Sequence, residues 1–385
     1  MVNKEVWEEE FESKNALAKE LEDYYSSKTK ELGLKDFKRI LKFFPNVGEN
    51  VKKGIIFAHY DFEKILEAIA EKKPWAVVSG LNPSGPLHFG HKAIFDELLW
   101  MQKNGAEIYI PVTNDESYVV GKTKSIAESR KIAYEEVIPS IIAFGFNPEK
   151  THIYVDSDYP DIYNVAMDIS TKLTLNKAFG VFGFDKTEKG ENPGTMFYRS
   201  AVQLAQILLP QYPEFGGPKP TLIPVGIDQH PYILLARDVA GKKGFIPPSE
   251  IVTKFLPSLK GPGKKMSAHL EDSCIYLTDS PEQAEKKIKK AYTGGLSSAK
   301  YQQEVGGIPE ICPIFQLLHY HFLNEIESKE LYLKYKEGKI LNKELKEITI
   351  TKVKNYLEEH KKKREEAKKI ISKFILNKKI NSILS

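Results

Sequence analysis

Short apolar segments alternate with helical segments from residue 75 to residue 279 of this 385-residue chain. The segments that we expect to be strands are Trp75–Ser79, Ile108–Pro111, His152–Asp156, Leu222–Val225, Ile251–Leu256 and Cys274–Thr278. The segments that we expect to be helices are 92–104, 125–144, 160–174, 200–209, 229–241 and 281–292. This alternation predicts an α/β fold, with a doubly wound parallel sheet and helices on both faces. Ligands of such sheets bind beyond the carboxyl ends of the strands, so we expect site residues in the loops that follow strands.

The segments on either side of this region have different patterns. The N-terminal part is rich in Lys and Glu, has a short expected strand at 54–60, and ends at Pro74, which indicates a small extension. The C-terminal part is almost entirely helical in pattern, and its last long helix is expected from about 343 to 377. The glycines, proline and charged residues of 183–195 are typical of a surface loop, which is either a lid or an inert connection. The three predicted parts are 1–74, 75–295 and 296–385.

The composition excludes several classes of protein. Lys and Arg number 56 against 52 Asp and Glu, and this net charge of +4 is too small to identify a nucleic-acid partner by itself. The two cysteines, Cys274 and Cys312, form neither a disulfide framework nor a metal-ligand spacing, so we expect no metal site and a reducing, cytoplasmic location. No apolar run approaches the ~20 residues that a membrane-spanning helix needs, so we expect no membrane partner.

A glycine-rich loop with two histidines joins the first expected strand of the sheet to its helix. The loop reads GLNPSGPLHFGH from Gly80 to His91. Glycine lets a backbone approach a ligand closely, and a helix start offers unpaired N–H groups to a phosphate. His88 and His91 share one face at the helix start, where they can donate hydrogen bonds to a phosphate during phosphoryl or nucleotidyl transfer. A metal pair and two surface histidines remain alternatives, although the loop has no cysteine or carboxylate to complete a metal site.

A second glycine-rich loop, with three lysines, follows the strand expected at 251–256. It reads KGPGKKMSAHLEDS from Lys260, and it includes Lys264 and Lys265. A mobile loop with lysines can close on the charge that develops on a pyrophosphate leaving group and can then open to release it. Taken alone, such a loop is more often plain solvated surface.

Together the two loops resemble the two signatures of class I aminoacyl-tRNA synthetases. PLHFGH resembles the His-Ile-Gly-His signature of that family, and KKMSA resembles its Lys-Met-Ser-Lys/Ala-Ser signature, in the same order. Further segments resemble the tryptophanyl-tRNA synthetases of the archaeal and eukaryotic type: VTNDESY, FGVFGF, IPVGIDQHPYILLARDVA, IYLTDSPEQ and KAYTGG. The resemblance covers most of residues 54–300, and GIIFAHYDFEKIL resembles the extension that precedes the catalytic domain of these enzymes.

This resemblance implies a Rossmann-type catalytic domain, a connective insertion at about 150–215 in a homodimer interface, and a helical anticodon-binding domain. It implies that ATP, with Mg2+, activates L-tryptophan as an adenylate and releases pyrophosphate. The tryptophanyl group then passes to the 2′-hydroxyl of the terminal adenosine of tRNA(Trp). Three alternatives stay open: a tyrosine–tRNA ligase of the same fold, a small-molecule nucleotidyltransferase, and an inactive RNA-binding paralogue. The long helical part argues against the second, and the intact histidines and lysine argue against the third.

The resemblance also implies roles for residues that match the motifs of the family. The residues implied in catalysis are His88, His91 and Lys265. The residues implied at the ATP site are Gly80, Pro83, Ser84, Gly90, Gly226, Asp228, Lys264, Met266 and Ser267. The residues implied at the amino-acid site are Glu116, Gln203 and Gln229. Asp228 also suits the N-cap of the helix that follows it, a role compatible with binding the ribose.

Three positions depart from the family pattern. His269 replaces the last serine of the lysine signature. Val78 and Pro111 stand where eukaryotic-type enzymes have a tyrosine and a glutamine that bind the indole N–H. An unpaired indole N–H in a dry pocket costs about 1–3 kcal/mol, so another acceptor is required. In bacterial relatives an aspartate on the corresponding helix serves, and our hypothesis is that Gln206 at that position, with Gln203, reads the indole.

Two features of the helical part suit a nucleic acid. Residues 361–380 carry nine Lys or Arg against two Glu, and His319–Phe322 bring four rings together. Basic charge with aromatic rings suits phosphates and unstacked anticodon bases. A solvated helix face and a bundle core are the alternatives, and for Leu318 and Phe322 we expect the bundle core. For Lys361–Arg364 we expect contact with tRNA, because the catalytic domain requires one.

Overall fold

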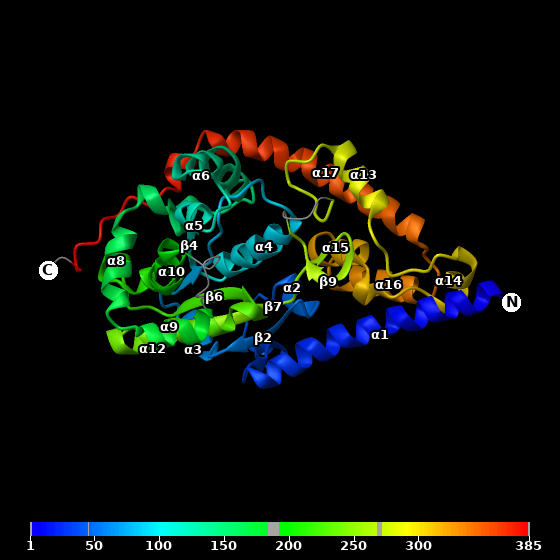
Figure 1. Ribbon diagram of the computed structural model, residues 1–385, viewed down its shortest axis with the longest axis horizontal. Helices are drawn as coiled ribbons and strands as arrows, with labels where there is room; N and C mark the ends of the chain where they lie inside the picture. The colour runs from blue at the N-terminus through cyan, green and yellow to red at the C-terminus, as the bar shows by residue number, and fades with distance from the viewer. Residues whose placement is uncertain (1, 45, 184–191, 268–271, 384–385) are drawn as a thin grey trace.

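The computed structural model describes residues 2–44, 46–183, 192–267 and 272–383. His269 and most of the expected surface loop therefore lie outside the described residues. In Figure 1, α1 (Val2–Glu31, blue) runs along one side of the molecule and α17 (Asn342–Lys368, orange to red) along the opposite side. In the part of the chain that is described, no helix is both long and apolar enough to cross a membrane.

A seven-stranded sheet lies at the centre. Its strands are β1 (Lys35–Asp36), β2 (Ile56–Tyr60), β3 (Ala76–Val78), β4 (Glu107–Val112), β5 (Thr151–Val155), β6 (Thr221–Gly226) and β7 (Ser249–Thr253). Their order is β1-β2-β7-β6-β3-β4-β5; the five from β7 to β5 are parallel, and β2 and β1 are antiparallel additions from the N-terminal part. The predicted doubly wound sheet is confirmed. Because the chain goes from β3 to β4 and β5 and then returns to β6, the topological switch point lies between β3 and β6.

Helices cover both faces of the sheet, because successive side chains of a strand point to opposite faces. Ile110 of β4 is buried in one core cluster, with α4 (Phe89–Lys103), whereas Tyr109 is buried in the other, with α11 (Gln203–Leu208). The other helices of this region are α2 (Glu49–Lys52), α3 (Glu63–Ala70), α5 (Asn114–Val119), α6 (Ile126–Ile132), α7 (Ile138–Ile142), α8 (Asp161–Ser170), α9 (Leu175–Phe182), α10 (Pro193–Phe197), α12 (His230–Lys243) and α13 (Pro281–Lys290). Helices α5, α9 and α10 were not expected from the sequence, because they are too short to show a clear helical period; α10 begins inside the expected surface loop 183–195.

The segment Cys274–Thr278 is not the strand that the sequence predicts. Its apolar side chains are buried, as the pattern requires, but its backbone pairs with the histidine loop rather than with the sheet. The Phe89 N–H donates to the Ile275 carbonyl (3.2 Å), and the Leu277 N–H donates to the Leu87 carbonyl (2.7 Å). An apolar run predicts that a segment is buried. It does not distinguish a strand of the sheet from a buried segment that pairs with a loop.

The C-terminal part is helical, but its end returns to the sheet. Its helices are α14 (Ala299–Val305), α15 (Pro313–His321), α16 (Glu325–Lys336) and α17. The last helix ends at Lys368, earlier than the sequence predicts. Beyond it, Ile153 of β5 donates to the Phe374 carbonyl and accepts from the Leu376 N–H, each at 2.8 Å. The bridging residue, Ile375, lies between Phe374 and Leu376, which are both buried.

The aromatic residues at the end of α15 lie inside the molecule. Leu318 is fully buried, His321 pairs with Asp96 of α4 (3.1 Å), and the Phe322 ring packs on Phe89 with centroids 5.7 Å apart. The bundle-core prediction for Leu318 and Phe322 is confirmed. The alternative, four rings offered to unstacked bases, is wrong because α15 packs against α4.

Candidate active site

His88 and His91 begin α4 and bond to its first turn. His88 is the N-cap; its Nδ1 accepts a hydrogen bond from the Gly90 N–H (3.1 Å), and Nδ1 of His91 accepts one from the His88 N–H (3.2 Å). The two rings stack, with centroids 3.9 Å apart. Because each Nδ1 is an acceptor, this network assigns the proton of each neutral ring to Nε2. Burial, with a smaller effect of Lys122, lowers the pKa of His91 to about 4, so this ring is a neutral donor at pH 7.

The lysine segment is a short hairpin, where the sequence predicts a flexible loop. Strand β8 (Pro257–Ser258) pairs with β9 (Gly261–Lys265). Lys264 and Lys265 are exposed, whereas Met266 is buried and donates its N–H to a backbone carbonyl of the incoming segment (2.8 Å). Backbone pairing and the buried methionine hold both ends of the segment that carries the lysines.

The histidine and lysine segments meet at the switch point of the sheet. A Cβ built on Gly90 would lie 3.5 Å from Cβ of Met266. Nζ of Lys265 lies 3.7 Å from Oδ2 of Asp228, which follows β6, and both side chains are about half exposed. An exposed ion pair of this length contributes little to stability, so a ligand can replace it at low cost. Segments that are far apart in the sequence thus form one edge of the molecule, as the sequence analysis requires.

Asp228 is not the N-cap that the sequence predicts. A 3-10 turn, Ile227–Gln229, precedes α12, whose N-cap position is occupied by Gln229 without a side-chain hydrogen bond. The insertion of this turn moves the Asp228 carboxylate away from the helix start. Its Oδ2 instead accepts from Nε2 of Gln229 (3.3 Å) and faces Lys265.

Three glycines of the predicted ATP site are required by close packing within the protein. A Cβ would lie 2.7 Å from Cγ of Pro111 at Gly80, 2.3 Å from the Phe255 ring at Gly226, and 2.8 Å from the neighbouring imidazole at Gly90. Such distances leave no room for any larger residue. The sequence analysis explains these glycines by the approach of a ligand. In the structure a protein side chain already occupies the space beside each of them.

A buried polar network lies where β4 and β5 end. Asp156 is fully buried and accepts a hydrogen bond from Nε2 of Gln206 (2.6 Å). The Tyr198 hydroxyl donates to Oε1 of the same glutamine (3.3 Å). Burial, and then the neighbouring Asp115 carboxylate, raises the pKa of Asp156 well above its usual value. The amide of Gln206 is thus held between Asp156 and Tyr198.

Sequence reasoning found Gln206 but missed the residues that hold it. Asp156 was included in an expected strand, and an acid at the end of an apolar run was the only available signal. Tyr198 gave none, because it comes from a turn of π-helix, Tyr198–Val202, that has no sequence signature. Among the described contacts, the Gln206 Oε1 accepts one hydrogen bond, from Tyr198.

The other predicted residues lie along the same loops. Oε2 of Glu116 accepts from the Thr113 hydroxyl (2.8 Å), which fixes this carboxylate just after β4. Gln203 is half-buried on α11, one turn before Gln206. The remaining predicted residues are Pro83, buried in the histidine loop, Ser84, exposed in it, and Ser267, whose carbonyl accepts from Ser273. Within the described ranges no three His, Cys, Asp or Glu side chains gather to hold a metal ion.

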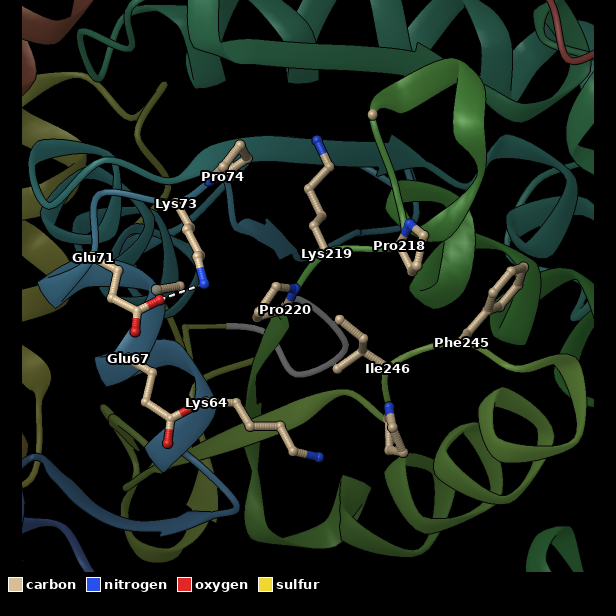
Figure 2. Close-up of a pocket in the computed structure, with 13 residues that line it drawn as sticks. Lys64, Glu67, Glu71, Lys73, Pro74, Pro218, Lys219, Pro220, Phe245 and Ile246 are labelled. Atoms are coloured by element: carbon tan, nitrogen blue, oxygen red, sulfur yellow. Dashed lines mark ion pairs between the residues drawn. The ribbon is translucent and has the colours of Figure 1, made fainter.

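A pocket at the opposite end of the sheet includes none of these residues. Figure 2 shows it between α3 and the segments that precede β3 and β6, with Pro74 and Pro220 on its walls. Its buried lysine, Lys219, is already paired with Glu107 (2.7 Å). Because ligands of such sheets bind at the carboxyl ends of the strands, the candidate site is the one at the switch point.

Comparisons with known proteins identify the family of the chain. Residues 70–358 match the family described as tRNA synthetases class I (W and Y). The tryptophan–tRNA ligase of Thermococcus sibiricus is 40% identical over 326 residues, which are 84% of this chain and 82% of that protein. The tryptophan–tRNA ligase of Methanocaldococcus jannaschii is 35% identical over 92% of this chain and 95% of its own. The crystal structure of tryptophanyl-tRNA synthetase from Aeropyrum pernix K1 superposes with a TM-score of 0.85 at 34% identity, over 93% of this chain and 97% of that one. The chain therefore belongs to the class I aminoacyl-tRNA synthetases, in the tryptophanyl-tRNA synthetase branch of archaeal and eukaryotic type.

Proposed function

We propose that this enzyme is a tryptophan–tRNA ligase that works in two steps at the switch point between β3 and β6. The carboxylate of L-tryptophan attacks the α-phosphorus of ATP, the bond to the bridging oxygen breaks, and pyrophosphate leaves. The 2′-hydroxyl of the terminal adenosine of tRNA(Trp) then attacks the carbonyl of the adenylate, and AMP leaves. The observation that supports this proposal is the contact of the histidine loop with the lysine segment beside Asp228.

The histidines and the lysine have different electrostatic roles in the first step. His88 and His91 each direct an Nε2–H away from the helix, because each Nδ1 is bonded to the backbone. Such preorganised neutral donors stabilise the charge that grows on the phosphate oxygens in the transition state. Lys265 supplies a point charge for the pyrophosphate once its ammonium leaves Asp228. Asp228 is then available to the ribose hydroxyls.

We expect Mg2+ to enter with the triphosphate. This ion keeps several waters and takes phosphate oxygens as ligands rather than a protein cage. The donors at the site fit this expectation, because they are imidazoles and a lysine, which bind phosphate oxygens. Lys264 and the loop residues Pro83 and Ser84 would lie along the same phosphates and adenosine.

The amino-acid pocket is proposed at the ends of β4 and β5. Gln229 would approach the substrate amino group, and Glu116 and Gln203 would contact the bound amino acid. Val78 and Pro111 are buried and offer no side-chain acceptor. Gln206, held by its two buried partners, presents the Oε1 lone pair that the indole N–H requires.

A homodimer would form through the connective insertion. Met167 on α8 and Leu175 on α9 are 68% and 65% exposed, and Phe197 and Leu234 add further exposed apolar surface. Exposed apolar side chains of this size suit a protein interface. Sedimentation at micromolar concentration should give twice the chain mass, and charged substitutions at Met167 and Leu175 should give the monomer.

The C-terminal part, 296–385, would bind the anticodon arm, with a smaller basic surface than the sequence indicates. Arg364 donates to Oε2 of Glu136 (2.8 Å) and so fastens α17 to the sheet domain, and Lys363 pairs with Glu359 (2.6 Å). Lys361 and Lys362 are exposed and remain as the phosphate contacts. We expect the enzyme to work in the cytoplasm, where tRNA and ATP are available.

The test is ATP–pyrophosphate exchange, run in parallel with tryptophan and with tyrosine. We expect exchange with tryptophan and at most a trace with tyrosine. Exchange with tyrosine alone would overturn the substrate, and no exchange with either amino acid would overturn the reaction. Charging of tRNA(Trp) then tests the second step.

A further inference from the structure

The dipeptide Lys254–Phe255 connects the sheet to the lysine hairpin. It follows β7, which ends at Thr253, and precedes β8. Any shift of this dipeptide moves the hairpin that carries Lys265, because only one residue separates it from β8. The contacts of Lys254 and Phe255 therefore matter to the ATP site.

The Phe255 ring supports two elements of that site at once. It lies so close to the end of β6 that a Cβ on Gly226 would be 2.3 Å from it. Nζ of Lys265 lies over the same ring, 5.2 Å from its centroid. The ring thus packs against both the end of β6 and the lysine hairpin.

The backbone of Lys254 is held by two parts of the chain. Its N–H donates to the Ile55 carbonyl (2.9 Å), and its carbonyl accepts from the Tyr320 hydroxyl of α15 (3.0 Å). With Lys254 fixed on both sides, the remaining freedom lies at Phe255.

Phe255 is held from the N-terminal helix. Its N–H donates to the hydroxyl of Tyr25 on α1 (3.1 Å), across 230 positions of sequence. Tyr25 is buried, and its ring packs edge-on against Phe57 of β2, with centroids 5.1 Å apart. The neighbouring Tyr24 is exposed and contacts the Tyr25 ring edge-on. Helix α1, which the sequence analysis left without a role, thus reaches the ATP site through one hydroxyl.

We propose that Tyr25 is a positioning residue for ATP, which acts by holding Phe255 between Gly226 and Lys265. The inference rests on the proposed function, because it takes Asp228 and Lys265 as ATP contacts. Removal of the hydroxyl leaves the Phe255 N–H without its partner and frees the ring to move. ATP binding should weaken, while tryptophan binding, at the other strand ends, should not change.

The test compares Tyr25→Phe with Tyr24→Phe as the matched control. Each variant loses one hydroxyl from adjacent positions of the same helix, and only the first hydroxyl touches Phe255. We expect Tyr25→Phe to weaken ATP binding, measured by calorimetry without amino acid, by about fivefold, the size of one neutral hydrogen bond. The KM for ATP in pyrophosphate exchange should rise by about the same factor, with the KM for tryptophan and the Tm close to those of the unchanged chain. Equal ATP affinity in the two variants would overturn the proposal, and so would a parallel loss for ATP and tryptophan.

A double-mutant cycle tests whether Tyr25 acts through the ring. Phe255→Leu should weaken ATP binding by itself, and adding Tyr25→Phe should then cause little further loss, because the hydroxyl has no ring left to position. Fully additive effects would overturn the proposal. Calorimetry does not require turnover, so a chain that binds ATP but fails in exchange would contradict the proposed function and would still test this inference.

Discussion

The substitution Gln206→Leu tests the indole contact in this enzyme. Leucine keeps most of the volume but removes the Oε1 acceptor, so the indole N–H would be buried without a partner. An unpaired buried donor costs about 1–3 kcal/mol, which corresponds to a loss of about 5- to 150-fold in kcat/KM for tryptophan. The loss should be smaller for any substrate that does not use this acceptor. Selectivity, measured as the ratio of exchange with tryptophan to exchange with tyrosine, is therefore the quantity to follow.

The same change also reduces stability, and this effect needs its own control. Asp156 and Tyr198 would each lose a hydrogen bond, at about 2–5 kcal/mol together. Gln211 is also fully buried, and its Nε2 donates to the Lys219 carbonyl (2.7 Å) and to Thr221 (2.9 Å), away from the site. Gln211→Leu should show a similar loss in urea denaturation with unchanged selectivity. If Gln206→Leu keeps the selectivity of the unchanged enzyme, the indole has another acceptor and the reasoning is wrong.

Three further perturbations address the catalytic loop, acid stability and tRNA binding. His91→Asn keeps an acceptor for the His88 N–H but loses the Nε2–H donor. The rate of adenylate formation, measured in a single turnover, should therefore fall by about 10²- to 10³-fold. A loss below tenfold would contradict the donor role of His91. The free energy of unfolding should fall as the pH drops from about 6.5 towards 4, because burial lowers the pKa values of six histidines and the unfolded chain therefore binds protons first. Urea denaturation at pH 7, 6 and 5 checks this, and a flat profile would refute it. Those histidines are His59, His91, His321 and His360, each with a pKa of about 4, His319, with a pKa of about 3, and His152, whose pKa is also lowered. The pair Lys361→Gln and Lys362→Gln should reduce the salt slope of tRNA binding by about 1.4, at about 0.7 for each lost phosphate contact, and an unchanged slope would exclude these lysines.

The sheet was predictable because its parallel strands are buried on both faces and are joined by helices with a clear period. The apolar runs from Trp75 to Leu256 therefore marked the right strands within a few residues. The same signal failed at Cys274–Thr278, where a buried segment pairs with the histidine loop. The local pattern of apolar residues predicts whether a segment is buried. The segment with which its backbone pairs depends on the rest of the fold.

The candidate site was predictable where a local motif carries it. His88, His91 and Lys265 stand in short patterns, and the structure brings their segments together. Asp156 and Tyr25 were missed because each acts on a partner far away in the sequence, 50 and 230 positions respectively. A hydrogen bond of that span leaves no periodic or compositional trace. The His319–Phe322 rings were compatible with both a core and a nucleic-acid surface, because an aromatic cluster has the same sequence in either place.

The C-terminal tail, residues 374–376, covers the outer edge of β5 at Ile153. An unpaired outer strand offers its N–H and C=O groups to any other chain, and here β5 would be that strand without residues 374–376. A product cut before Phe374 would keep every motif of the site and yet present a bare backbone edge. Such a fragment should self-associate through β5, and a short peptide with the sequence of the tail should suppress the aggregation.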